Sequence, residues 1–416
     1  MDSWVPYAVW WHVYPLGFTG ALTAGPGHRL PAIRDWLDYA VELGANGLQL
    51  GPIFASSTHG YDTTDHFRID PRLGDEADFD ALVSAARSRG LRILLDGVFN
   101  HVGRDFQAPA SWFSGTVFEG HDELPELDHS RPEVLDYTVQ VMEHWLDRGA
   151  DGWRLDAAYA VRPAFWKAAL DRVRQRHPAA WFVGEMIQGD YAAYQEASGL
   201  DAITQYELWK AIWSSINDGN FFELAWALER HASFGLPMTF VGNHDVTRIA
   251  SRLDDPRHLA HALVVLFLAS GVPSVYYGDE QAFRGVKEDR SGGDDAIRPR
   301  FPASPADLAP YGWPTYRLHE RLIGFRRRHP WLASAALTPA HLTNTAVALS
   351  AEGSGQRVLA LLNVGDDEYK FPIEASDLRV AESGEDQPGP MTVPGHSWAI
   401  LTSTGLTSAG LTSAGE

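Results

Sequence analysis

Acidic residues follow four short apolar segments of the chain, and such residues carry out acid–base and nucleophilic chemistry. The segments are LRILLDGVFNH with Asp96, GWRLDAA with Asp156, WFVGEM with Glu185, and MTFVGNHD with Asp245. In the second segment, Arg154 and Asp156 lie two positions apart, so on a strand they share one face and should form an ion pair. A single pair of this kind is more often structural than catalytic.

The spacing of the four segments indicates how they meet. They lie roughly 30 residues apart or twice that, which is one or two strand–loop–helix units, because eight such units occupy about 250 residues. Each strand would then deliver its polar residues to the same rim of a parallel barrel.

The elements needed for such a barrel can be found along the chain. The helical spacing at Leu30–Leu43 and at Phe79–Arg89 ends at a glycine in each case, as helices often do. Eight strand candidates alternate with such segments, which indicates a parallel sheet. The candidates are Ala8–Tyr14, Gly47–Leu50, Leu91–Leu95, Gly152–Leu155, Trp181–Gly184, Ala202–Gln205, Met238–Val241 and Pro273–Tyr277.

One connection and the C-terminal region break this rhythm. Residues 102–128 have no helical period, and loops of this length are usually functional or form a small subdomain. Their aromatic residues Trp112, Phe113 and Phe118 could line a binding site or form the loop's own core. After residue 330, short strand-like runs separated by turn residues predict an antiparallel sandwich.

The predicted domains are therefore a barrel of residues 1–101 and 129–330, an inserted subdomain of residues 102–128, and a C-terminal sandwich of residues 331–403. Residues 404–416 form a low-complexity repeat that cannot bury apolar surface and should be disordered or adventitiously packed.

Composition excludes several classes of function. The net charge of −20 argues against nucleic acid or an anionic membrane as partner. The chain has no cysteine, so disulfides and thiolate chemistry are excluded. The N-terminus lacks the pattern of a secretory signal, and the longest apolar stretch is too short to span a bilayer. We therefore expect a soluble cytoplasmic protein.

Seven motifs together resemble those of the α-amylase superfamily, glycoside hydrolase family 13. They are DGVFNH, GWRLDAA, VGEM and FVGNHD in the family's order, with LPELD, HGYDTTD and GVPSVYYGDE beside them. The resemblance covers about residues 4–330 and implies a (β/α)8 TIM barrel with a short insert after the third strand, to which the pattern after residue 330 adds the C-terminal antiparallel β-sandwich.

The resemblance also implies catalytic roles. Retaining hydrolysis of a glucoside needs a nucleophilic carboxylate and a carboxylic acid that donates a proton. Asp156 matches the nucleophile, with Arg154 keeping it ionised and oriented and Asp96 supporting the site. Glu185 matches the general acid/base, and its apolar strand could raise its pKa toward neutrality. Asp245 matches the third carboxylate, which grips the distorted sugar.

Further residues match sugar contacts of the family. His101 and His244 would hydrogen-bond the sugar, and Tyr61 would stack on it. Asp294 and Arg298 resemble a pair that contacts the next sugar along, although a loop salt bridge is the alternative. Taken singly, residues of these types are more often structural, so the expectation depends on their occurring together.

Departures from the family bear on substrate and metal. Tyr159 stands where many α-amylases have a lysine that contacts leaving-group sugars, and the insert is short. Asn100 matches one family calcium ligand, which is weak support because Ca²⁺ takes six to eight oxygens. We therefore expect no required cofactor, with structural calcium left open, and an oligosaccharide substrate. A homodimer that completes the site is a further expectation.

Three interpretations follow from the motifs. The first is a retaining hydrolase of α-1,4 bonds in short or cyclic maltooligosaccharides, resembling the cyclomaltodextrinase and neopullulanase branch or a cyclic maltosyl-maltose hydrolase. The second is a transglycosylase or isomerase, or an ordinary endo-acting α-amylase, that uses the same catalytic residues. The third, an inactive glycan-binding scaffold, is disfavoured because all three carboxylates and Arg154 are present.

Overall fold

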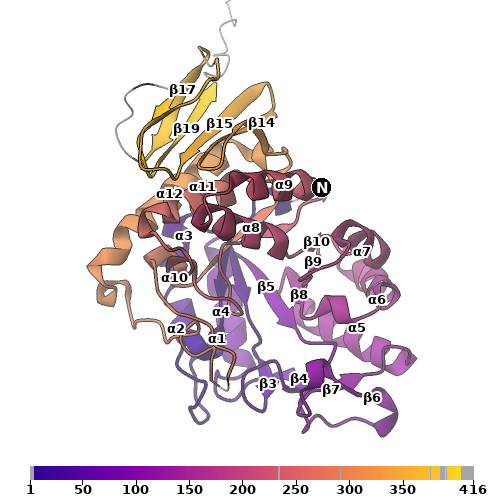
Figure 1. The fold of residues 1–416 in the computed structure, drawn as a ribbon. Helices are drawn as coiled ribbons and strands as arrows, with labels where there is room; N and C mark the ends of the chain where they lie inside the picture. The colour runs from indigo at the N-terminus through magenta and orange to yellow at the C-terminus, as the bar shows by residue number, and fades with distance from the viewer. Residues whose placement is uncertain are drawn as a thin grey trace, which may run out of the picture.

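Eight parallel strands form the central sheet of the computed structural model, which describes residues 4–232, 235–290, 292–374, 376–384, 389 and 391–403 (Figure 1). The strands are β1 (Trp10–Val13), β2 (Gly47–Leu50), β5 (Arg92–Gly97), β8 (Gly152–Leu155), β9 (Trp181–Gly184), β10 (Ala202–Ile203), β11 (Met238–Thr239) and β12 (Val272–Tyr276). Their order is β10-β9-β8-β5-β2-β1-β12-β11, and a parallel bridge between Thr204 and Met238 joins the two ends. The sheet thus closes into the predicted (β/α)8 barrel.

Helices surround this sheet (Figure 1). In chain order they are α1 (Pro15–Phe18), α2 (Leu30–Arg34), α3 (Leu37–Leu43), α4 (Glu76–Ser88), α5 (Pro132–Asp147), α6 (Pro163–Arg176), α7 (Tyr191–Ser198), α8 (Tyr206–Asn217), α9 (Phe221–His231), α10 (Ile249–Arg252), α11 (Leu259–Leu268) and α12 (Trp313–Arg328). None of the helices in the described part of the chain is both long and apolar enough to cross a membrane.

The barrel strands are buried on both faces, which explains their nearly continuous apolar sequences. Trp10 and Trp181 stack with ring centroids 5.8 Å apart inside one end of the barrel, and Trp4 packs edge-on against both. Bulky side chains therefore fill this end, and the polar residues that follow the strands lie at the other.

Two small antiparallel pairs extend the rim. β3 (Phe54–Ser56) pairs with β4 (Thr63–Ile69) after the second barrel strand, and β6 (Phe113–Val117) pairs with β7 (Pro125–Leu127) after the third. The second pair lies within the predicted insert.

The C-terminal sheet is antiparallel and contains β13 (Thr338–Leu342), β14 (Ala346–Gly353), β15 (Gln356–Asn363), β19 (Ser397–Ser403) and β17 (Leu378–Ser383) in that order, with β16 (Tyr369–Lys370) and β18 (Thr392–Val393) paired separately. This matches the predicted sandwich. Alternate residues point to opposite faces, so Val347 and Leu349 join the barrel's core while Ala346 and Ala348 join a core within the domain. The predicted boundary at residue 331 stays a prediction, and the repeat at 404–416 lies outside the described residues.

Helix α11 lies where the barrel meets the C-terminal sheet (Figure 1). Every residue from His261 to Leu268 is buried, as expected for a helix that is apolar on all sides. Its C-terminal end is held by Arg326 of α12, whose guanidinium donates to the carbonyls of Phe267 at 2.8 Å, Ala269 at 2.9 Å and Gly271 at 2.5 Å. Burial lowers the pKa of Arg326 to about 10.

We expect Arg326→Met to lower the free energy of unfolding by about 2–4 kcal/mol, because it leaves buried carbonyls without donors. The matched control is Arg328→Met. Arg328 is exposed, and its contact with Glu382 is long, at 3.5 Å, so its loss should change the free energy of unfolding by less than about 0.5 kcal/mol. Urea unfolding followed by circular dichroism measures both. Equal midpoints for the two variants would contradict this role of Arg326.

Candidate active site

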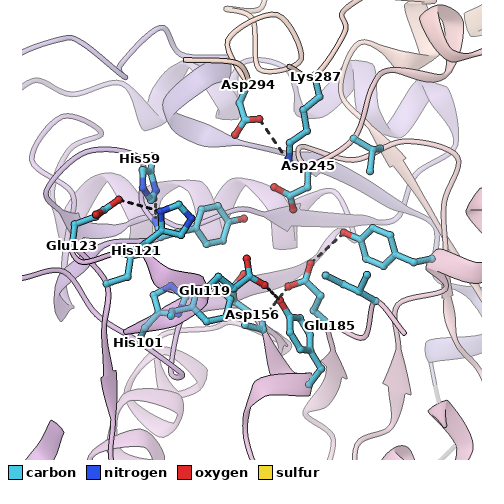
Figure 2. A pocket seen from close by; sticks show the side chains of 18 of the residues that line it. His59, His101, Glu119, His121, Glu123, Asp156, Glu185, Asp245, Lys287 and Asp294 are labelled. Carbon is cyan, nitrogen blue, oxygen red and sulfur yellow. Dashed lines mark hydrogen bonds and ion pairs between the residues drawn. The ribbon is translucent and has the colours of Figure 1, made fainter. Parts of the chain in front are cut away.

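A cavity of about 540 Å³ lies at the end of the barrel where the four motif segments meet (Figure 2). Asp156 follows β8, Glu185 follows β9 and Asp245 follows β11, and all three line it. Parallel strands deliver their following residues to one edge, which is why segments distant in sequence meet there.

Arg154 lies beneath the carboxylates and binds three of them. Its Nη1 donates to both oxygens of Asp96 at 2.8 Å and to Oδ1 of Asp156 at 3.0 Å, and its Nη2 donates to Oε1 of Glu185 at 2.6 Å. The predicted Arg154–Asp156 ion pair is therefore confirmed. Arg154 is 3% exposed and does not line the cavity, so its contacts orient the carboxylates, and its predicted part in substrate binding stays a prediction.

The turn after Asp156 fixes Glu185. Ala157 has φ 45°, in the left-handed region, and its backbone N–H donates to Oε2 of Glu185 at 3.0 Å. A side-chain-bearing residue in this conformation costs about 1–2 kcal/mol. Tyr206 donates its hydroxyl to the other oxygen of Glu185 at 3.2 Å. Asp156 and Glu185 are thus both held in fixed positions beside the guanidinium of Arg154.

Burial shapes the charges at the site. It raises the pKa of Asp156 well above its usual range, Glu185 raises it further, and Arg154 opposes both. Arg154 shares its charge with Asp96 and Glu185 as well, so the expectation that it keeps Asp156 ionised stays a prediction. Burial also raises the pKa of Asp96.

Asp245 differs from the other carboxylates. Burial opposes its ionisation, but His244, Arg298 and Arg154 together hold the pKa of Asp245 well below its usual range. His244 places Nε2 2.9 Å from Oδ2 of Asp245, and Arg298 donates to Oδ1 at 3.0 Å. Asp245 therefore stays ionised and faces the cavity.

The other predicted residues divide into two groups. Tyr61, His101, Tyr159 and Asp294 line the cavity as expected. His244, at 1% exposed, and Arg298 do not line it, so they support Asp245 where the resemblance implied sugar contacts. Arg298 also binds Asp294 at 2.8 Å, which is the salt bridge considered as the alternative.

The insert contributes one wall. Phe118 stacks on His101 with ring centroids 4.3 Å apart, so it belongs to the cavity. Trp112 packs against Tyr137 and Phe113 against the core, so these two do not line it. Glu119 accepts a hydrogen bond from the hydroxyl of Tyr159 at 2.8 Å.

Several lining residues were missed by sequence reasoning. Glu119, His121 and Glu123 lie in a loop with no periodic pattern. Tyr206 and Trp209 lie three positions apart in the first turn of α8, soon after β10. Because residues that follow a barrel strand lie at the rim, their position in the sequence could have identified them. The further missed residues are His59, Leu124, Ile187, Val246 and Lys287.

Asn100 is the residue that the resemblance implies as a calcium ligand. This residue is buried, and its side-chain nitrogen lies 3.3 Å from Nδ1 of His101. Among the described residues, the groups of three His, Asp or Glu close enough to share a cation lie elsewhere. Calcium at Asn100 stays a prediction.

Comparison with known proteins supports the resemblance. The family described as "Alpha amylase, catalytic domain" matches residues 12–117 and 116–352. The cyclomaltodextrinase of a Bacillus species is 29% identical over 339 residues, 68% of this chain and 60% of that protein. The intracellular maltogenic amylase of Bacillus subtilis (strain 168) is 30% identical over 343 residues, 69% of this chain and 57% of that protein. The match thus spans less than two thirds of either relative.

A solved structure shows the same architecture over nearly the whole chain. The ligand-free cyclic alpha-maltosyl-(1→6)-maltose hydrolase from Arthrobacter globiformis superposes with a TM-score of 0.81 at 25% identity. The alignment covers 97% of this chain and 100% of that one.

We expect Arg154→Met to destabilise the protein by about 3–5 kcal/mol at pH 8, because it leaves buried carboxylates without their cation. The deficit should shrink as the pH falls toward 5. Without Arg154 the pKa values of Asp96 and Asp156 rise further, so the folded variant takes up protons that the unfolded chain does not, and acid stabilises it relative to the parent. Urea unfolding across this range provides the measurement. A deficit that is constant with pH would show that packing, not charge, explains the loss.

Proposed function

The chain belongs to the alpha-amylase family, and from that premise we propose that it hydrolyses α-1,4-glucosidic bonds of short or cyclic maltooligosaccharides with retention of configuration. The observation that carries the proposal is the shared binding of Asp156 and Glu185 by one buried guanidinium. Retaining enzymes need their two carboxyl groups only about 5–5.5 Å apart, and a common cation favours such closeness.

In the first step, Glu185 donates a proton to the glycosidic oxygen while Asp156 attacks the anomeric carbon. The bond to the leaving sugar breaks and a covalent glycosyl ester forms on Asp156. In the second step, Glu185 takes a proton from water, which attacks the same carbon and releases Asp156. The first step therefore requires the proton on Glu185 and the ionised form of Asp156.

Asp245 has a different task in this proposal. Because His244 and Arg298 keep it ionised, it can accept hydrogen bonds from two ring hydroxyls and stabilise a distorted sugar. Tyr61 and His101 line the cavity beside it and offer aromatic faces to the same ring.

The size and wall of the cavity support compact substrates. Small-molecule sites occupy about 300–1,000 Å³, and this cavity of about 540 Å³ has room for few sugar units. The hydroxyl of Tyr159 is held by its hydrogen bond to Glu119. The backbone N–H of Tyr159 donates to the carbonyl of Glu185 at 3.3 Å, so its ring offers an aromatic surface beside Glu185. The names of the relatives, a cyclomaltodextrinase and a cyclic maltosyl-maltose hydrolase, agree with this choice.

The rest of the proposal concerns cofactors, cellular location and oligomeric state. The steps above use no metal or organic cofactor, and calcium would act on stability only. An intracellular location is proposed because one relative is named an intracellular maltogenic amylase. A second copy that completes the substrate site stays a prediction.

We expect Asp156→Asn and Glu185→Gln each to lower kcat by roughly 10³-fold or more on maltotetraose, while folding is retained. An activated substrate separates the two roles, because fluoride leaves without protonation. With α-maltosyl fluoride, Glu185→Gln should form the ester quickly and hydrolyse it slowly, so intact mass spectrometry detects one maltosyl unit on the protein. Asp156→Asn should form none.

The surface variant Asp171→Asn serves as the control and should match the parent, because Asp171 is exposed and pairs with Lys167, which is exposed as well. Turnover of maltotetraose by Asp156→Asn within tenfold of the parent would remove Asp156 from the proposed mechanism.

We expect kcat/KM on maltotetraose or cyclic maltooligosaccharides to exceed that on soluble starch by at least about tenfold, because this ratio measures differential transition-state binding. The comparison is made at equal concentrations of reducing-end or ring equivalents, with products separated by chromatography. Preference for starch would identify an endo-acting amylase, and ring or chain rearrangement without net hydrolysis would identify a transglycosylase.

A further inference from the structure

A second cluster of polar side chains lies where the C-terminal sheet meets the barrel. Asp255 and His258 precede α11, and His396 precedes β19. Nε2 of His258 is 3.0 Å from Nδ1 of His396, and Oδ2 of Asp255 is 4.0 Å from the same nitrogen. One ligand atom from each of the three residues lies within 4.8 Å of the others.

We propose that this cluster binds a divalent transition-metal cation of the Zn²⁺ type. Zinc forms bonds of about 2.0–2.2 Å with nitrogen and oxygen in tetrahedral geometry, which places ligand atoms roughly 3.3 Å apart. The distances of 3.0 and 4.0 Å bracket this value. Two imidazoles and one carboxylate suit Zn²⁺, Co²⁺ or Ni²⁺, whereas Ca²⁺ and Mg²⁺ prefer oxygen ligands.

The surroundings of His396 support its role as a ligand. Its Nε2 lies 2.8 Å from Oδ1 of Asp366. A carboxylate on the far nitrogen of a metal-binding histidine fixes the tautomer, and here it leaves the lone pair of Nδ1 directed at His258. The two imidazoles are therefore oriented to share a cation.

The backbone at His396 gives a second argument. Its φ is 56°, in the left-handed region that favours glycine, and its N–H donates to the carbonyl of Gly365 at 3.0 Å. A histidine in this strained conformation is explained if its side chain has a task there.

Asp255 is also bound by Arg257, whose Nη2 lies 2.6 Å from Oδ2. The Nε of Arg257 also lies 3.0 Å from both oxygens, and its backbone N–H donates to Oδ1 at 2.9 Å, so a cation on Oδ2 takes the place of the guanidinium while Oδ1 keeps the backbone donor. Arg257 has a 60% exposed side chain and can move away without disturbing the core.

A comparable group elsewhere has a different explanation. His28, Asp75 and Asp78 are also close together, but this group offers a single imidazole, and its two carboxylates form the capping box of α4. His28 is mostly exposed and pairs with Asp78 at 2.5 Å. This group therefore provides a matched control.

The proposed site would act on stability, not turnover. Its ligands come from the barrel side and from the C-terminal domain, so a bound cation ties the two together. Neither Asp255, His258 nor His396 lines the cavity of the candidate active site.

The test uses the full chain without a histidine tag, stripped of metal with a chelator. Co²⁺ is titrated and followed by its visible absorption, and Zn²⁺ by calorimetry and thermal unfolding. We expect one tight equivalent of Co²⁺ per chain and a rise in Tm with Zn²⁺ that the chelator reverses. His258→Gln should weaken Co²⁺ binding at least tenfold, and Asp366→Asn by about tenfold.

His396→Gly removes the ligand but suits the left-handed backbone, so it should fold with unchanged circular dichroism and lose the response of Tm to Zn²⁺. His28→Gln should bind Co²⁺ like the parent. The proposal is overturned if the parent binds no Co²⁺ with a Kd below roughly 100 µM, or if His396→Gly binds it equally well.

Discussion

A single buried guanidinium determines how the rest of the site can be built. Arg154 is enclosed by the barrel and must be neutralised there, because an uncompensated buried charge is strongly destabilising. Asp96, Asp156 and Glu185 provide that neutralisation from three adjacent strands. The same contacts fix the relative positions of the nucleophile and the acid, so the groups that stabilise the cation are also the groups proposed for the chemistry.

The barrel wall makes this arrangement rigid. Asp96 lies opposite Arg154 in the pairing of β5 with β8, and Glu185 receives the N–H of strained Ala157. Neither carboxylate can turn away without leaving a buried donor of Arg154 or Ala157 unpaired. Such preorganisation is what electrostatic stabilisation of a transition state needs, since little rearrangement is then required during the reaction.

Much of this could be predicted from the sequence. The bounds of β2, β8 and β9 match the predicted strands, because short buried runs end at glycine or at polar residues. The reach of Arg154 to Asp96 and Glu185 could not be predicted, since it depends on the register between strands. The wall residues Glu119 and His121 lie in an aperiodic loop. The contact of His258 with His396 joins residues 138 positions apart, and local patterns carry no information at that distance.

The burial of α11 also bears on how the chain is made. This helix shares one apolar core with strands β14, β15 and β19, and His261 lies 3.0 Å from the carbonyls of Asn363 and Ser397. During synthesis on a ribosome, all eight barrel strands emerge before those partners do. One face of α11 then remains uncovered until the last sheet arrives, and the nascent barrel presents apolar surface at that face during this interval.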